Sequence, residues 1–216
     1  MMKKNSETSY PHADNLANLL TICTLLSHIG FSIAFRSFQE KGSWPSASLQ
    51  YSFWEDPTKM LSVIHGFFSF AFALLYYKKY IRLHTWRILL SFSLGYFTFD
   101  LSKYYLFQAI QLDNGLLNHA IHHSMVIWII IVYITKYPQL AALGFLSELT
   151  NVFLNIGLLM YKAQLSHLLS FKLVSLCLIV SFLWLRIYNF TKICFALFKR
   201  KAPKYELCIF MAITFM

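Results

Sequence analysis

Charged side chains are scarce in this sequence. Asp, Glu, Lys and Arg make up only 13% of its 216 residues, whereas 57% are hydrophobic and 18% are aromatic. Few soluble domains combine so little charge with so much apolar surface. The composition therefore argues against a soluble domain and predicts an all-helical protein that crosses a membrane several times.

Cysteine is also rare, and its spacing excludes two common small frameworks. The four cysteines (Cys23, Cys177, Cys194 and Cys208) are scattered, mostly within apolar segments, and form no C-x-x-C pair. This pattern indicates neither a disulfide framework nor a zinc finger. We expect the cysteines to be small, buried hydrophobic side chains.

Acidic residues are outnumbered: nine Asp and Glu stand against 19 Lys and Arg, which gives a net charge of +10. Such an excess can point to nucleic acid. Here, however, the basic residues lie between apolar runs rather than on a polar face with interleaved aromatics. They are better explained as charges that flank membrane spans, so no nucleic-acid partner is expected.

A cleavable signal peptide is not indicated either. The polar segment 1–14 precedes an apolar run that is too long for the hydrophobic part of a signal peptide. That run also lacks a small-residue cleavage site. We therefore expect it to stay in the membrane as an anchor.

Six apolar segments are long enough to cross the hydrocarbon core, which takes about 20 residues of helix, with a range of about 17–25. They are Leu16–Phe35, Leu61–Tyr77, Trp86–Phe107, His119–Thr135, Leu140–Met160 and Leu168–Phe190. Lys and Arg gather in the loops on one side of these spans, and the positive-inside rule then places both ends of the chain in the cytoplasm. The apolar tail Tyr205–Met216 is about half a span long, which predicts a re-entrant segment or a shortened seventh span.

Ionisable residues inside these spans are the first candidates for function, because a charge at the bilayer centre costs about 2.5–3.5 kcal/mol. Such residues must pair with one another or line a polar cavity. Glu148, Asn151 and Asn155 lie at i, i+3 and i+7 and therefore share one helix face. The ionisable set is His28, His65, Asp100, Lys103, His119, His122, His123, Glu148, Lys172 and Arg186.

Three histidines, His119, His122 and His123, lie at i, i+3 and i+4 where the fourth span begins. As a metal site they copy one histidine box of membrane di-iron desaturases and hydroxylases, but those enzymes need several boxes and the other five histidines are isolated. A single zinc held with Asp100 or Glu148 fits ligand chemistry, yet the sequence does not demand it, so no metal is expected. Imidazoles that titrate near neutral pH suit proton transfer or nucleophilic attack. The third alternative is a polar helix end near the lipid headgroups.

Five short segments occur in the order that one membrane family uses. They are Val63–Gly66, Gly95–Leu101, His122–His123, Leu146–Asn155 and Phe182–Ile187. With these segments the chain resembles the TLC domain family, which includes the ceramide synthases and a set of smaller lipid-homeostasis proteins. The resemblance implies a helical barrel around a lipid-accessible central cavity. It also implies a TLC domain in residues 61–216, shortened at its C-terminus, after a cytoplasmic tail, an anchor and a loop in residues 1–60.

The resemblance also implies roles for the polar residues. In the ceramide synthases the paired histidines are associated with moving an acyl group from acyl-CoA to a sphingoid-base amine. On that model His122 or His123 would be the base or the acyl acceptor, and Asp100 would orient it. The residues expected to line the cavity and position lipid are His65, Glu148, Asn151, Asn155 and Arg186.

The chain departs from the synthases because no His-Asp…Asp acidic motif follows the histidine pair. The resemblance is therefore nearer to the small TLC-domain proteins. It implies a protein of the endoplasmic reticulum or another endomembrane that binds sphingolipid, phospholipid or fatty-acyl species and contributes to membrane lipid homeostasis. One alternative is a lipid acyltransferase that uses His122 and His123, with acyl-CoA as co-substrate and no other cofactor. Another is a non-catalytic protein that binds cargo or associates with a translocon.

Overall fold

The computed structural model of the protein describes residues 11–42, 57–107, 114–206 and 208. Within these ranges the chain is helical, with no strand, as the composition predicts. The elements in chain order are α1 (Pro11–Gly42), α2 (Pro57–Tyr77), α3 (Leu83–Phe107), α4 (Asn114–Lys136), α5 (Pro138–Phe145), α6 (Glu148–Lys162), α7 (Leu169–Ser181), the π-helix η1 (Phe182–Tyr188) and α8 (Asn189–Lys199).

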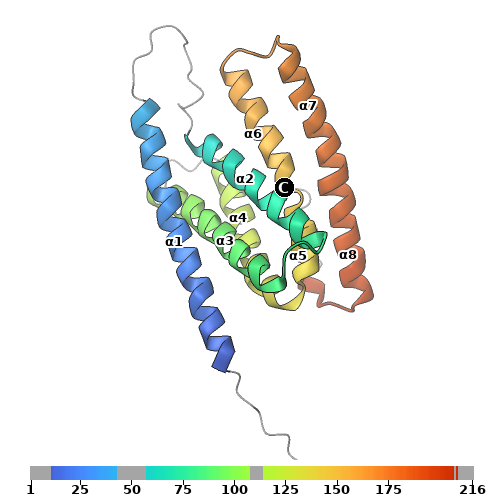
Figure 1. The fold of residues 1–216 in the computed structure, drawn as a ribbon. Coiled ribbons are helices and arrows are strands. Elements are labelled where there is room, and N and C mark those ends of the chain that lie inside the picture. The colour runs from blue at the N-terminus through green and yellow to red at the C-terminus, as the bar shows by residue number, and fades with distance from the viewer. Residues whose placement is uncertain (1–10, 43–56, 108–113, 207, 209–216) are drawn as a thin grey trace, which may run out of the picture.

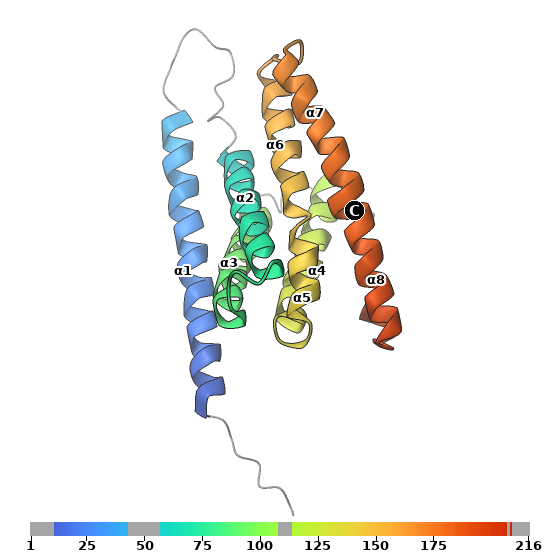
Figure 2. The ribbon, with the colours of Figure 1, turned by 45° about the vertical axis from the view of Figure 1, so that its right-hand side comes forward.

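The helices form one bundle in which neighbours in space are not always neighbours in sequence (Figure 1). α1 packs along α3, and α2 packs on α3, α5 and α6. α6 and α7 form a helical hairpin, and η1 and α8 continue the direction of α7 down the side of the bundle (Figure 2). This arrangement places α2, α3, α4 and α6 around the interior polar residues.

Small residues set how closely α1 and α3 approach. A Cβ atom on Gly95 of α3 would lie only 2.5 Å from Ser27 Cβ and 2.6 Å from the Thr24 carbonyl oxygen of α1. Ser27 Oγ donates a hydrogen bond across the same contact to the Phe92 carbonyl oxygen, at 2.7 Å. Glycine at position 95 therefore allows a backbone-to-backbone contact that a larger residue would prevent.

Four helical stretches are long and apolar enough to cross a membrane: Asn18–Ser37, Thr58–Tyr77, Pro138–Lys162 and Leu169–Lys199. They overlap the first, second, fifth and sixth predicted spans. The third predicted span lies in α3, and the fourth in α4, which contains the shorter apolar stretch Ala120–Val132. The chain is thus a helical membrane protein by length and composition, and a total of six spans in a barrel stays a prediction.

The fifth predicted span is not one continuous helix. It divides into α5 and α6 at Leu146 and Ser147. The Ser147 N–H donates to the Gly144 carbonyl oxygen at 3.0 Å, and Ser147 Oγ donates to the same oxygen at 2.7 Å. These i→i+3 contacts tighten the last turn of α5. α6 then begins at Glu148.

The sixth predicted span is also irregular, because it contains η1 between α7 and α8. A π-helical segment rotates the residues that follow it relative to a regular α-helix, and such segments are frequent at functional sites. Arg186 lies within this segment.

The prediction that the cysteines are buried is wrong. Cys177 and Cys208 are exposed, Cys23 and Cys194 are half-buried, and all four are free thiols. Cys177 belongs to the outer face of α7, where Leu173, Leu176 and Ile179 are also exposed. An apolar segment of a membrane helix can face lipid as well as protein, so the apolar surroundings did not imply burial.

Candidate functional site

Two neighbouring groups of polar side chains lie in the interior of the bundle. The first contains His65 of α2, Asp100 of α3 and His123 of α4. The second contains His122 of α4, Glu148, Asn151 and Asn155 of α6, and Arg186 of η1. All eight predicted site residues are therefore placed in or beside the interior, and no single helix supplies either group.

His65 is fully enclosed, with 1% of its surface exposed. Its Nε2 lies 3.0 Å from Ser69 Oγ, which in turn lies 3.0 Å from Ser93 Oγ of α3. Its ring stacks on Tyr96, with centroids 3.9 Å apart. His65 therefore has polar and aromatic partners of its own and serves as a packed histidine of the core.

The side chains of His123 and Asp100 are in contact. His123 Nδ1 lies 3.2 Å from Asp100 Oδ2, and the two residues are only 6% and 2% exposed. A carboxylate beside Nδ1 favours the proton on that nitrogen, which leaves Nε2 as the basic nitrogen of a neutral ring. This is the arrangement of an oriented general base.

Phe97 connects this pair to His65. Its ring lies 5.1 Å from the His123 ring and 5.0 Å from the His65 ring, measured between centroids, and both contacts are edge-to-face. His65, Asp100 and His123 thus form one buried unit around an aromatic ring.

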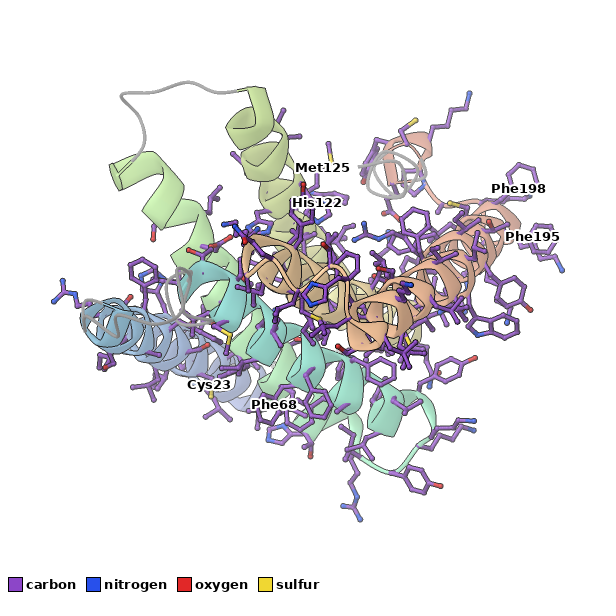
Figure 3. The ribbon with its side chains drawn as sticks, turned by 90° about the horizontal axis from the view of Figure 1, so that it is seen from above. Cys23, Phe68, His122, Met125, Phe195 and Phe198 are labelled. Atoms are coloured by element: carbon purple, nitrogen blue, oxygen red, sulfur yellow. The ribbon has the colours of Figure 1, made fainter. Side chains whose placement is uncertain are left out.

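Three members of the second group line a small cavity of about 40 Å³. His122, Glu148 and Arg186 supply its polar wall, and side chains such as Val126 and Phe190 supply its apolar wall. Figure 3 shows His122 near the middle of the molecule, viewed from above. A buried water needs roughly 10–15 Å³ of such space. The cavity therefore has room for a few waters or one polar group, and not for a whole lipid.

Asn151 connects the charged members of this group. Its Nδ2 donates to Glu148 Oε2 at 3.1 Å, and its Oδ1 accepts from Arg186 Nη2 at 3.5 Å. Asn155 Nδ2 donates to Ser62 Oγ of α2 at 2.9 Å and to the Asn151 carbonyl oxygen at 2.8 Å. Glu148, Asn151 and Asn155, which were predicted to share one helix face, therefore belong to one connected network.

One hydrogen-bond donor of Arg186 is not used by the residues that the structure describes. Its Nε is buried and has no hydrogen-bond partner among the residues that the structure describes. A buried donor without a partner costs about 1–3 kcal/mol. Because Arg186 lines the cavity, an acceptor oxygen placed there would remove this cost.

Gly66 brings α2 against the start of α6. A Cβ at Gly66 would lie 3.0 Å from the Glu148 carbonyl oxygen and 3.0 Å from Val152 Cγ2. The glycine that follows His65 therefore allows α2 to pack closely on α6. Gly66 belongs to the segment Val63–Gly66 that carries the resemblance. Its role depends on α6, which begins about eighty residues later in the sequence.

Some predicted features lie outside this arrangement. The side chains of His119 and Lys103 lie outside the described part of the chain, so a three-histidine cluster and the expected contact between Asp100 and Lys103 remain predictions. Among the described residues, no three His, Cys, Asp or Glu side chains are close enough to hold a metal ion. The lipid-accessible central cavity stays a prediction; the described cavity beside His122, Glu148 and Arg186 has a volume of about 40 Å³.

Sequence reasoning missed the serines and aromatics that complete the site. Ser62 bonds to Asn155 and Ser69 bonds to His65, while Ser93 bonds to Ser69. The rings of Tyr96 and Phe97 pack against the His65 ring. Serine is common on membrane helices, so only the tertiary contacts single these three out. Tyr96 and Phe97 lie within Gly95–Leu101, one of the segments that carry the family resemblance. The sequence alone assigned no role to either ring.

The chain matches a family model but no curated protein and no solved structure. A family model described as the TLC domain matches residues 57–216, which include α2 to α8 and every residue of the two polar groups. The match covers well over half of the sequence, and the chain therefore belongs to the TLC domain family.

Proposed function

We propose that this protein binds a membrane lipid at the cavity beside Arg186 and contributes to the homeostasis of membrane lipid composition. The observation that carries the proposal is the buried Nε of Arg186, which lines the cavity without a partner among the described residues. Ionisable groups are expensive inside a membrane and are usually kept there for function.

The chemistry of the cavity favours an oxygen-bearing lipid headgroup. Arg186 supplies donors for a carboxyl, phosphate or carbonyl oxygen. Glu148 can accept a hydrogen bond from a hydroxyl or an amine. His122 can either donate or accept a hydrogen bond. The apolar wall at Val126 and Phe190 suits the adjoining hydrocarbon. Sphingolipids, phospholipids and fatty acids all carry such groups, and the 40 Å³ cavity fits one polar group while the acyl chains stay outside it.

The orientation is proposed from the charge distribution of the sequence, and the organelle from the family. Basic residues gather on one side of the predicted spans, so we place both ends of the chain on the cytoplasmic side. Membership of the TLC domain family supports a location in the endoplasmic reticulum or another endomembrane. Protease protection of tags at the two ends in sealed microsomes tests this placement. Tags on opposite sides of the membrane would contradict it.

Native mass spectrometry of the purified protein tests lipid binding. Wild-type protein should carry a co-purifying lipid, and Arg186→Met should lose it because the replacement keeps the apolar stem but removes the donors. Lys172→Met is the matched control, since Lys172 is exposed on α7, away from the cavity. Wild-type protein that is empty in every preparation, together with unchanged lipid composition in cells lacking it, would overturn the proposal.

A second candidate function rests on a different observation, the contact between His123 and Asp100. From this contact we propose that the protein is an acyl-CoA-dependent lipid acyltransferase. The amine or hydroxyl of an acceptor lipid attacks the thioester carbonyl and passes its proton to His123 Nε2. The C–S bond breaks as the C–N or C–O bond forms, and the proton leaves on the CoA thiolate. Asp100 stabilises the intermediate imidazolium.

Labelled acyl-CoA with a panel of amine and hydroxyl lipids tests this second function. Wild-type protein should form a labelled acyl product, and the double variant with alanine at His122 and His123 should not. Equal product from both proteins would show that the chemistry does not use these residues.

A further inference from the structure

A second cavity lies apart from the polar site, between α1, α2 and α3. Its volume is about 700 Å³, which falls within the range of about 300–1,000 Å³ typical of small-molecule sites. Its walls include Cys23, Gly30 and Phe31 of α1, Phe68 and Phe72 of α2, and Phe92 of α3. Figure 3 shows Cys23 and Phe68 close together in the view from above. We name this cavity the α1–α2 groove.

The groove offers hydrocarbon surface and almost no polar group. Its walls are aliphatic and aromatic except for Cys23 and Ser27. Ser27 Oγ already donates to the Phe92 carbonyl oxygen at 2.7 Å. Phe31 stands between the groove and His65, with ring centroids 6.2 Å apart. The groove is therefore an apolar site that is separate from the cavity beside Arg186.

One end of the groove leads toward a basic segment. Along α2, Phe72 is followed six residues later by Lys78, roughly 9 Å further at 1.5 Å per residue. Lys78, Lys79 and Arg82 are exposed in the connection between α2 and α3. Residues 74–90 contain no Asp or Glu. On α3, the groove-lining residues Ile88 and Leu89 lie six and seven residues after Arg82.

We propose that the α1–α2 groove binds one acyl chain of an anionic phospholipid, whose phosphate lies beside Lys78, Lys79 and Arg82. An apolar groove with no unpaired polar group selects hydrocarbon, and the one-signed charge at its end selects an anionic headgroup. This site goes beyond the proposed function, because α1 lies outside the region matched by the TLC domain and none of the eight site residues lines the groove.

Cys23 reports on groove occupancy in the unaltered protein. The protein is reconstituted in vesicles of phosphatidylcholine alone or with phosphatidylglycerol, and alkylation by a membrane-permeant maleimide is mapped by peptide mass. Phosphatidylglycerol should slow the labelling of Cys23, while Cys177, exposed on α7, should be labelled at the same rate in both vesicles. Equal labelling of Cys23 in the two compositions would overturn the proposal.

Substitutions at Gly30 test the groove directly. A Cβ at Gly30 meets no atom within 4 Å, so the position accepts a side chain that begins to fill the groove. Gly30→Phe should fill the groove and abolish the retention of phosphatidylglycerol in native mass spectra. Ile29→Phe is the control, because Ile29 is exposed but does not line the groove. Unchanged retention in Gly30→Phe would contradict the assignment of the groove.

The headgroup assignment has its own test. Replacing Lys78 by Gln should weaken phosphatidylglycerol retention about fivefold, because one basic side chain contributes about 1 kcal/mol near an anionic lipid surface. Retention of phosphatidylcholine should not change. Equal binding of the two lipids by wild-type protein would rule out an anionic headgroup as the preferred ligand.

Discussion

Replacing Gly95 by alanine should separate α1 from α3. The added Cβ would lie 2.5 Å from Ser27 Cβ, 2.6 Å from Ser27 Oγ and 2.6 Å from the Thr24 carbonyl oxygen. Carbon atoms in good contact are about 3.5–4.0 Å apart, so the two helices must part by about 1 Å. Rotation of the Ser27 side chain would not relieve the clash, because the Thr24 carbonyl oxygen belongs to the backbone of α1.

The size of the effect follows from two opposed terms. Overpacking of a core typically costs about 1–3 kcal/mol. Alanine in a helix interior is favoured over glycine by about 0.8–1.0 kcal/mol, which offsets part of that cost. The difference is a net loss of up to about 2 kcal/mol in the free energy of unfolding. For a protein of about 150–250 residues this lowers Tm by up to about 8 °C.

Thermal unfolding of purified protein in detergent micelles measures this loss, with Gly157→Ala as the matched control. A Cβ at Gly157 of α6 would make only an ordinary contact, 3.7 Å from Val174 Cγ1, so this variant should be as stable as wild type or more stable. If Gly95→Ala unfolds at the same temperature as Gly157→Ala, the close contact between α1 and α3 does not exist in solution.

Three further predictions concern the interior and the C-terminal segment. If the protein transfers acyl groups, Asp100→Asn should slow the transfer by about 10²–10⁴-fold without unfolding the protein, as measured with labelled acyl-CoA, because an amide cannot stabilise the His123 imidazolium; full activity would exclude that role. Asn155→Leu should lower the free energy of unfolding by about 1–3 kcal/mol, since two hydrogen bonds are lost in the interior, and a Tm equal to wild type would contradict the network. The 2.6 Å hydrogen bond from Lys136 Nζ to Glu206 Oε1 raises the pKa of Lys136 above its ordinary value. A raised lysine pKa stabilises the fold below the unfolded pKa, and the effect is lost as the pH rises through the folded pKa, so the Tm difference between wild type and Glu206→Gln should hold up to about pH 10 and shrink above it. A difference that is already lost at neutral pH would contradict this contact.

The sequence predicted the helices and much of the polar site for a physical reason. Apolar length is the main requirement for crossing a bilayer, and four of the predicted spans coincide with long apolar helices. Burying an ionisable group in such a helix is costly, so Asp100, Glu148 and Arg186 stood out before any contact was known. The structure places all three in the interior with polar neighbours.

Most features that escaped prediction depend on contacts between distant segments. The break at Ser147 is an exception, because it arises from local bonds to Gly144 inside a segment that was predicted as one span. Ser62 gains its importance only from Asn155, which lies 93 residues later. The α1–α2 groove could not be foreseen, since no periodicity reveals which helix packs beside α1.

Photo-crosslinking with a clickable, photoactivatable lipid tests the central claim most directly. Wild-type protein in native membranes is irradiated, digested and mapped by mass spectrometry. Lipid binding at the polar cavity predicts crosslinks on peptides that contain His122, Glu148 or Arg186, and their loss in Arg186→Met but not in Lys172→Met. Crosslinks confined to the outer face of α7, with none on these peptides, would contradict the account.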